Sequence, residues 1–330
     1  MLKAKTWESL AGQPALSAER PAATRIAWID SARGIGIILV VFGHALRGLL
    51  SAGSVPEEGW REVDYILYSF HMPLFMFLAG MNVPRSLQKP MFLQKKARGI
   101  LWPYFLWSVI HGLTMVAAGR FTNSDFEVSR LLSIAYAPIS PFWFLYVLFL
   151  FMIVVKIWPP DRILLGASLV LLSLSPLIGQ PTLYQFSYFL FFFVLGALFT
   201  PPARPGLLLV AGSAIFAAGH GVLLWQGLQQ NLHYYAPALL PLALAGAAAV
   251  LGLAMLTTRL QALVWLGQAS MAIYVMHIIF TAGFRAVFSR LGVEDPFLLV
   301  TLVTLAGVIG PACVYVMLKK LRLARLTGLA

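Results

Sequence analysis

The first apolar segment of the chain carries four ionisable residues, Asp30, Arg33, His44 and Arg47. His44 follows Arg33 by 11 positions, which is about three full turns of an α-helix, so the two side chains share one helix face. Asp30 can reach Arg33 as an i, i+3 ion pair. These residue types suit proton transfer or anion binding, and such a stripe must face a bundle interior or a wet cavity. The alternative is that Asp30 and Arg33 only anchor the helix at the membrane interface.

Two further histidines are expected at the depth of His44. A rise of 1.5 Å per residue places His44 about 21 Å above the cytoplasmic edge of a hydrocarbon core about 30 Å thick. His71 then falls about 10 Å below the opposite face and His277 about 20 Å above the cytoplasmic edge, so the three rings lie level. His111 and His220 also fall within the membrane, but a histidine bonded across helices explains each of them more simply.

The residues around His71 and His277 strengthen both candidates. Pro73 kinks a helix because it has no N–H to donate, and a kink beside His71 opens space; an ordinary proline kink is the alternative. Ser270, Tyr274 and His277 follow i, i+4, i+7 spacing and therefore form a polar stripe on one helix face.

These polar side chains must be held by structural elements that shield them from the lipid. Of 330 residues, 60% are hydrophobic and 11% are charged, whereas a soluble chain has about a quarter charged. The sequence therefore predicts an all-α, polytopic transmembrane bundle. About ten apolar runs approach the length needed to span a bilayer, roughly 31–50, 65–82, 100–118, 142–158, 163–178, 184–199, 206–226, 235–256, 264–284 and 297–318.

The charges of the connecting segments predict the orientation. The chain carries a net charge of +12, and 18 of its 24 Lys and Arg fall on the side of both termini, giving that side +14 and the other side −2. Basic loops stay in the cytoplasm, so both termini are expected there, in a multi-pass protein of the cell (inner) membrane. This placement explains the basic composition without nucleic acid, whose binders cluster bases on one folded face.

The chain is expected to form one membrane unit. Residues 1–29 are predicted as a cytoplasmic tail without a cleaved signal peptide, residues 30–318 as a single transmembrane domain, and residues 319–330 as a basic cytoplasmic tail. Cys313 is the one cysteine, which excludes an intramolecular disulfide and a cysteine metal cluster. No metal is expected.

Several of these motifs occur together and in order. Asp30, the pair Arg33-Gly34 and His44 resemble the first-span motif of the acyltransferase 3 family of integral-membrane O-acyltransferases, particularly its short, fucose 4-O-acetylase-like members. The family's second-span motif resembles Phe70-His71-Met72-Pro73-Leu74-Phe75 with Gly80, and its basic run before the third span is similar to Lys96 and Arg98 before Pro103-Tyr104. Two weaker similarities are Trp143-Phe144-Leu145, and Tyr274 with His277. The resemblance extends over about residues 25–320.

The resemblance implies transfer of an acyl group, most often acetyl, from a cytoplasmic acyl-CoA to a hydroxyl of a cell-surface glycan or lipid-linked sugar. The partners are then acyl-CoA (acetyl-CoA above all), the sugar acceptor and membrane lipids. His44 is expected to act as general base, since histidine as a residue type titrates near the operating pH, with His71 as the second histidine and Asp30 holding Arg33. Direct transfer is expected, and a covalent acyl-histidine is the alternative.

Binding roles follow from the same resemblance. The coenzyme phosphates suit guanidinium and ammonium groups near the cytoplasmic face, and the expected ligands are Arg33, Lys96 and Arg98. The expected substrate-binding residues are Trp143, Tyr274 and His277, although an aromatic belt at the interface also explains Trp143. Outer-loop residues could shape the choice of acceptor, and the candidates are Trp60, Arg120 and His233.

A different class of function uses the same residue types. A transporter or flippase could relay protons or bind an anionic solute through buried Asp, Arg and His groups. Many transporters consist of inverted repeats, and no such repeat is visible in this sequence. A non-catalytic membrane scaffold would leave the intramembrane histidines unexplained.

Overall fold

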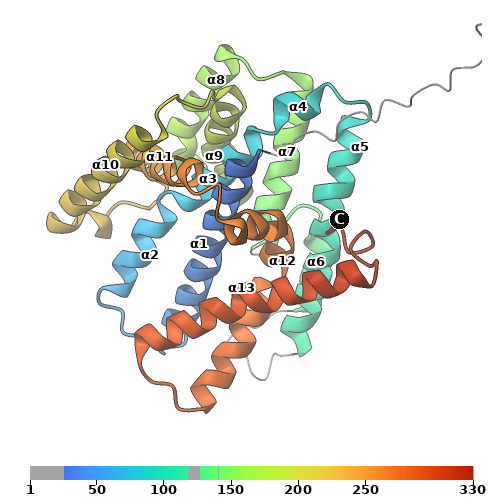
Figure 1. The fold of residues 1–330 in the computed structure, drawn as a ribbon, viewed down its shortest axis with the longest axis vertical. Helices are drawn as coiled ribbons and strands as arrows, with labels where there is room; N and C mark the ends of the chain where they lie inside the picture. Colours follow the sequence, from blue (N-terminus) through green and yellow to red (C-terminus); the bar gives the residue numbers. More distant parts are fainter. Residues whose placement is uncertain (1–25, 118–126, 140, 330) are drawn as a thin grey trace, which may run out of the picture.

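The computed structural model describes residues 26–117, 127–139 and 141–329, and these residues form helices and connecting segments without a strand (Figure 1). The predicted all-α bundle is therefore confirmed. Arg120 and nearly all of the predicted N-terminal tail lie outside the described residues.

Ten apolar helical segments follow one another in the described part of the chain. Eight are long and apolar enough to cross a membrane, and two shorter ones, α7 (Trp143–Ile157) and α8 (Arg162–Leu174), lie between the third and the sixth. The long segments are built from α1 (Ala27–Ser51), α2 (Trp60–Tyr68) with α3 (His71–Gly80) and α4 (Val83–Leu87), α5 (Phe92–Lys96) with α6 (Trp102–Ala117), α9 (Pro181–Leu198), α10 (Pro205–Trp225), α11 (Leu240–Leu256), α12 (Gln261–Arg290) and α13 (Pro296–Lys320).

The second segment is not one continuous helix. Helix α2 ends at Tyr68 and α3 begins at His71, with Phe70 between them at φ −134°. Pro73 has no N–H for the carbonyl of Ser69 and its ring would clash there, so the helix breaks just ahead of the proline. The break lies directly beside His71, where the sequence predicts a kink.

Helix α1 lies at the centre of the bundle and packs closely on α12 (Figure 1). A Cβ added at Gly34 would lie 2.1 Å from the Leu263 carbonyl oxygen, and one added at Gly267 would lie 1.7 Å from that of Asp30. Small residues let two membrane helices approach this closely. The crossing therefore fixes Asp30 against the first turns of α12.

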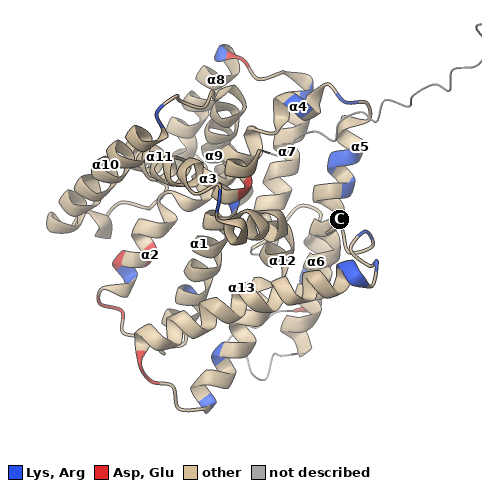
Figure 2. Ribbon diagram, in the orientation of Figure 1, with Lys and Arg blue, Asp and Glu red and all other residues tan. Residues whose placement is uncertain are grey.

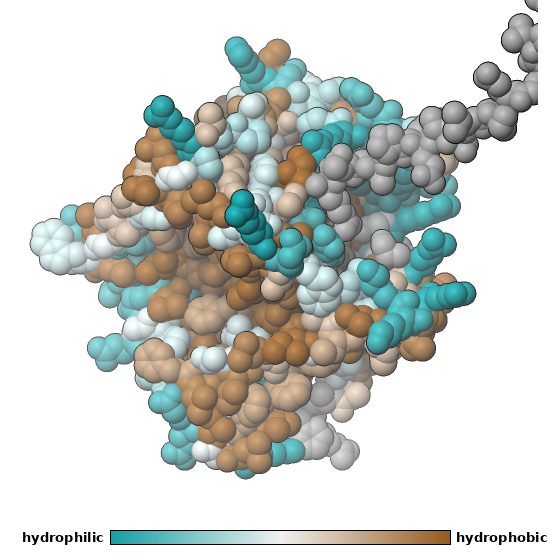
Figure 3. Space-filling view, in the orientation of Figure 1, coloured by the Kyte–Doolittle hydropathy of each residue, from teal (hydrophilic) through white to brown (hydrophobic). Residues whose placement is uncertain are grey.

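The surface shows where water and lipid are expected. Charged residues gather mainly at helix ends and in connecting segments (Figure 2), and hydrophobic side chains cover much of the face seen in Figure 3. On α10, Leu207 and Val210 are 66% and 67% exposed. A contiguous apolar exterior of this extent marks a membrane-facing surface, so the chain is a multi-pass membrane protein.

Candidate active site

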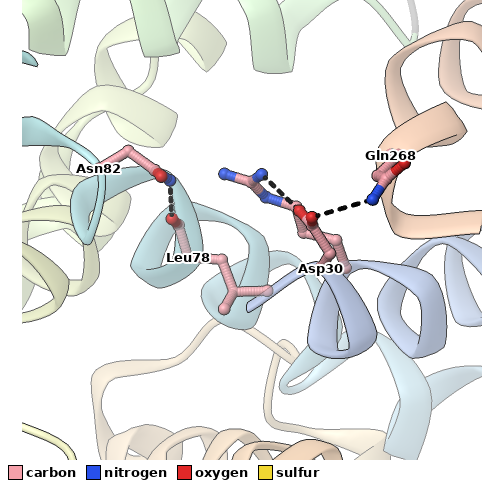
Figure 4. Close-up of polar contacts among 5 residues, drawn as sticks. Asp30, Leu78, Asn82 and Gln268 are labelled. Atoms are coloured by element: carbon pink, nitrogen blue, oxygen red, sulfur yellow. Dashed lines mark hydrogen bonds and ion pairs between the residues drawn. The ribbon is translucent and has the colours of Figure 1, made fainter. Parts of the chain in front are cut away.

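A polar cluster lies at the start of α1. The Asp30 side chain is almost fully buried, and its Oδ1 lies 3.4 Å from Nη1 of Arg33, which confirms the predicted i, i+3 ion pair. Gln268 of α12 donates from Nε2 to Oδ2 of Asp30 at 3.5 Å (Figure 4). The sequence analysis did not single out Gln268, because only the α1–α12 crossing brings it to Asp30.

A cavity of about 280 Å³ opens beside this cluster, and we call it the Asp30 cavity. From α1 it is lined by Asp30, Arg33 and Val40, and from α12 by residues between Gly267 and Tyr274. Its remaining wall comes from apolar side chains of α3 and α7. Its polar groups are therefore concentrated at one end of a mostly apolar space.

The basic residues before α6 lie at different distances from this cavity. Lys96 at the end of α5 is within electrostatic reach of Arg33 and Lys89, and its Nζ lies 5.5 Å from the centroid of the Phe92 ring. Arg98 follows in a π-helical turn (Ala97–Leu101) and is exposed. The structure thus brings Lys96 toward Arg33 but does not place Arg98 on the cavity wall.

Two histidines face each other where α1 and α12 pass one another. The ring centroids of His44 and His277 are 5.0 Å apart. His277 is fully buried and donates from Nδ1 to the carbonyl of Tyr274 at 2.6 Å. Because that bond fixes the proton on Nδ1 of the neutral ring, Nε2 carries a lone pair, and it has no hydrogen-bond partner among the described residues.

His71 presents the same arrangement. Its Nδ1 donates to the carbonyl of Leu67 at 2.7 Å, and its buried Nε2 also has no partner within the part of the chain that is described. The ring of Tyr68 lies 4.5 Å from His71 and 6.3 Å from His44, centroid to centroid. The histidines predicted to lie level are thus brought together, His277 directly and His71 across Tyr68.

A second cavity, of about 710 Å³, begins at His44, and we call it the His44 cavity. It runs between α1, α6 and α12, and His111 of α6 contributes to its wall. The buried Nδ1 of His111 has no hydrogen-bond partner among the described residues. From the sequence, a hydrogen bond across helices was the simpler expectation for His111; its place on the cavity wall depends on how α6 meets α1.

The two cavities approach the histidine pair from opposite ends of the same helices. On α1, the Asp30 cavity ends at Val40 and the His44 cavity begins one turn later; on α12, the first ends at Tyr274 and the second begins at Ile278. His44 and His277 lie at this changeover. A group entering from either end can therefore approach the same pair of imidazoles.

An ion pair joins this region to a third cavity. Arg47 donates from Nε and Nη2 to the two carboxylate oxygens of Asp64 at 2.8 and 2.9 Å, and its Cζ lies 3.1 Å from the centroid of the Tyr68 ring. Arg47 and Asp64 also line the third space, the Arg47 cavity, of about 810 Å³. The pairing of Arg47 with Asp64 could not be predicted from the sequence, because a helix-face argument within α1 cannot identify partners on α2.

Trp143, Tyr274 and His220 also have partners outside the histidine pair. Trp143 stacks on Phe189 at 5.2 Å, while the residues beside it line the Asp30 cavity. The Tyr274 hydroxyl donates to the Pro141 carbonyl at 2.6 Å, just before α7. His220 bonds to the Phe216 carbonyl, and its Nε2 lies 3.2 Å from Oγ of Ser69, the residue directly after α2. This contact is the bond across helices that was expected for His220 from the sequence.

Most of the chain matches a family model, and part of it is similar to two curated proteins. Residues 26–316 match the family model of the acyltransferase 3 type, described as an acyltransferase domain. Nodulation protein NolL of Mesorhizobium japonicum is 28% identical over 182 residues, 52% of this chain and 47% of that protein. Nodulation protein NolL of Sinorhizobium fredii is 27% identical over 179 residues, again 52% and 47% of the two chains. The aligned part of the chain thus spans about half the length of the curated relatives it matches.

No solved structure matches the chain significantly. The family match confirms the resemblance inferred from the first-span motif.

Proposed function

Since the chain belongs to the acyltransferase 3 family, we propose that it moves an acyl group, acetyl in the first instance, from a cytoplasmic acyl-CoA to a hydroxyl of a cell-surface glycan or lipid-linked sugar. One observation supports this most directly. On α1 and α12, the Asp30 cavity ends at Val40 and Tyr274, and the His44 cavity begins at His44 and Ile278, so donor and acceptor can approach the His44–His277 pair from opposite sides.

The Asp30 cavity is the proposed donor site. Arg33 lines its polar end, Lys96 is within electrostatic reach of Arg33, and Arg98 follows Lys96 by two residues. Coenzyme A presents phosphates, which pair well with guanidinium and ammonium groups. Asp30 and Gln268 keep the Arg33 end of the cavity in place, and the thioester then extends along the apolar wall toward His44.

His44 is the proposed general base. It removes the proton from the acceptor hydroxyl as the oxygen attacks the thioester carbonyl carbon. The tetrahedral intermediate collapses by breaking the C–S bond, and the thiolate takes up the proton that His44 held. His71 and His277 each offer a bare Nε2, which can accept a hydrogen bond from the acceptor and orient it; Tyr274 and Trp143 would bind substrate around the same passage.

The proposed orientation places Asp30, both termini and acyl-CoA on the cytoplasmic side of the cell (inner) membrane. The segment from Glu57 to Asp64 then faces the opposite compartment, where the glycan is expected. The distribution of basic residues supports this arrangement.

The proposal is tested by measuring the thiol that the purified protein releases from acetyl-CoA. A lipid and glycan extract of the source membranes serves as the acceptor. His44→Ala should lower the rate by a factor on the order of 10²–10⁴, the usual contribution of a general base. His220→Asn is the matched control, because His220 is buried at membrane depth but bonds to Phe216 and Ser69 rather than facing a cavity.

The same pair of variants separates an enzyme from a transporter. If wild type and His44→Ala release thiol equally slowly while uptake of an anionic solute into vesicles depends on His44, acyl transfer is refuted. Thiol release that depends on His44 but not on His220 supports the enzyme.

A further inference from the structure

Arg285 is an arginine within a membrane-spanning helix that has no carboxylate partner among the described residues. It lies on α12 at the His44 cavity, half-buried, and its Nη1 donates to the Gly48 carbonyl of α1. The ion pairs of the described residues use other arginines. A charge in an apolar environment is costly unless an opposite charge neutralises it. Arg285 is therefore suited to bind an anion from outside the chain.

The cavities on this side of the histidine pair differ in charge. The Arg47 cavity contains three acidic residues, Glu57, Glu62 and Asp64, against two arginines, Arg47 and Arg61, whereas the charged residues lining the His44 cavity are Arg47 and Arg285, both basic. An anionic ligand is therefore favoured more in the second cavity than in the first. Arg285 keeps most of its guanidinium N–H donors, which match the oxygens of a phosphate.

The rest of the His44 cavity has a mixed lining, in which hydroxyl groups such as those of Ser51, Thr114 and Thr281 lie beside apolar side chains. Met115 of α6 and Ile278 and Ile279 of α12 line it, and its volume of about 710 Å³ is in the range of ligand-binding cavities. Beside it, Leu113 of α6 and Phe284 of α12 are 52% and 39% exposed. An apolar chain can thus lie between α6 and α12 while its charged group stays at Arg285.

We propose that the His44 cavity binds an amphiphile with a phosphate group next to an apolar chain, its phosphate on Arg285. Within the proposed function, on which this step rests, the acceptor is then a sugar linked to a lipid through phosphate rather than a free glycan. Gly48, which Arg285 contacts, lies four residues beyond His44, about 6 Å along the helix. That spacing leaves room for a sugar attached to the phosphate to present its hydroxyl to His44.

Binding to the intact protein in phosphatidylcholine nanodiscs, measured without any acyl donor, tests this inference. The probes are dodecyl phosphate, 1-dodecanol and inorganic phosphate. Dodecyl phosphate should bind saturably and at least tenfold more tightly than either of the others. Arg285→Gln should weaken it at least tenfold, whereas Arg290→Gln, a control at the exposed end of the same helix and off the cavity wall, should not.

Three results would overturn the inference. If 1-dodecanol binds as tightly as dodecyl phosphate, the phosphate group does not contribute to binding. If inorganic phosphate binds as tightly, the apolar chain does not contribute. Loss of dodecyl phosphate binding when the nanodiscs are made of phosphatidylglycerol would assign the site to a membrane lipid instead of an acceptor. The wild-type probe comparison decides the matter even if Arg285→Gln does not fold.

The two proposals fail separately. Loss of thiol release with normal, Arg285-dependent binding of dodecyl phosphate would refute acyl transfer alone. Normal His44-dependent thiol release without such binding would refute the lipid phosphate site alone.

Discussion

Arg47 connects the histidine pair with the opposite surface of the protein. It lines both the His44 cavity and the Arg47 cavity, pairs with both oxygens of Asp64 and covers the ring of Tyr68. Tyr68 in turn lies between His44 and His71. The ion pair therefore holds the aromatic ring that separates two proposed functional imidazoles.

A double-mutant cycle measures this coupling. Arg47→Gln leaves the carboxylate of Asp64 poorly paired in a partly buried place and should destabilise the protein by roughly 1–3 kcal/mol. Arg47→Gln with Asp64→Asn should recover part of that loss, because neither remaining amide carries a charge. The free energies of unfolding of both variants, of Asp64→Asn and of the wild type in mixed detergent give the coupling energy between the two residues. Strictly additive losses of stability would contradict a direct interaction.

His233 lies between α10 and α11, outside the membrane-spanning segments, and burial lowers its pKa, with the charge of Arg47 acting in the same direction. Its Nδ1 accepts the backbone N–H of Tyr235 at 3.2 Å, which favours the neutral ring. Since the pKa is lower in the folded protein, its contribution to stability is complete above the unfolded value of about 6.5. That contribution is lost as the pH falls through the lowered folded value.

Melting temperatures measured between pH 7.5 and 4.5 test this expectation. His233→Gln should show a smaller decrease on acidification than wild type, because the variant has no imidazole to protonate there. The comparison cancels the contributions of the other histidines. A steeper acid decrease in the variant would contradict the assigned direction of the pKa shift.

At the scale of the helices, the close crossing of α1 and α12 aligns the proposed donor site with the histidine pair. Gly267→Ala would place a methyl group 1.7 Å from the Asp30 carbonyl oxygen, so the helices must move apart, at a cost of about 1–3 kcal/mol. Thermal unfolding and thiol release should both decrease. Gly166→Ala on α8, where an added Cβ meets nothing within 4 Å, should leave both unchanged or raise the stability by up to about 1 kcal/mol; equal losses in the two variants would contradict the crossing.

The positions of the helices, the Asp30–Arg33 ion pair and the helix distortion beside His71 were predictable from the sequence. The bilayer thickness demands long apolar segments, and an i, i+3 pair such as Asp30 with Arg33 depends only on local helix geometry. Pro73 likewise predicted a distortion beside His71, where the helix breaks.

Contacts between distant helices could not be predicted in this way. Gln268 reaches Asp30, Asp64 reaches Arg47 and His111 reaches the His44 cavity only because particular helices cross. Helix periodicity identifies which face of a helix is polar but not which neighbour covers it. For the same reason the sequence did not show that Trp143 would stack on Phe189 beside the Asp30 cavity.

Across the full thickness of the bundle, two cavities end on opposite sides of one histidine pair. A soluble enzyme can collect both substrates from one solution. Here the cavities extend toward opposite ends of α1 and α12, and the basic side of the chain is the one predicted to face the cytoplasm. The acyl group is therefore expected to enter from one side and to leave attached to an acceptor on the other.

Sealed membrane vesicles from cells that express the protein test this claim most directly, because they retain the native acceptor. Radiolabelled acetyl-CoA, which does not cross the membrane, is added to inverted and to right-side-out vesicles, and label is measured in the glycan and lipid fraction. We expect inverted vesicles, whose cytoplasmic face is outside, to incorporate label, right-side-out vesicles to remain unlabelled until they are opened, and His44→Ala to abolish incorporation in both. Equal labelling of the two sealed preparations, or labelling that persists in His44→Ala, would contradict the account.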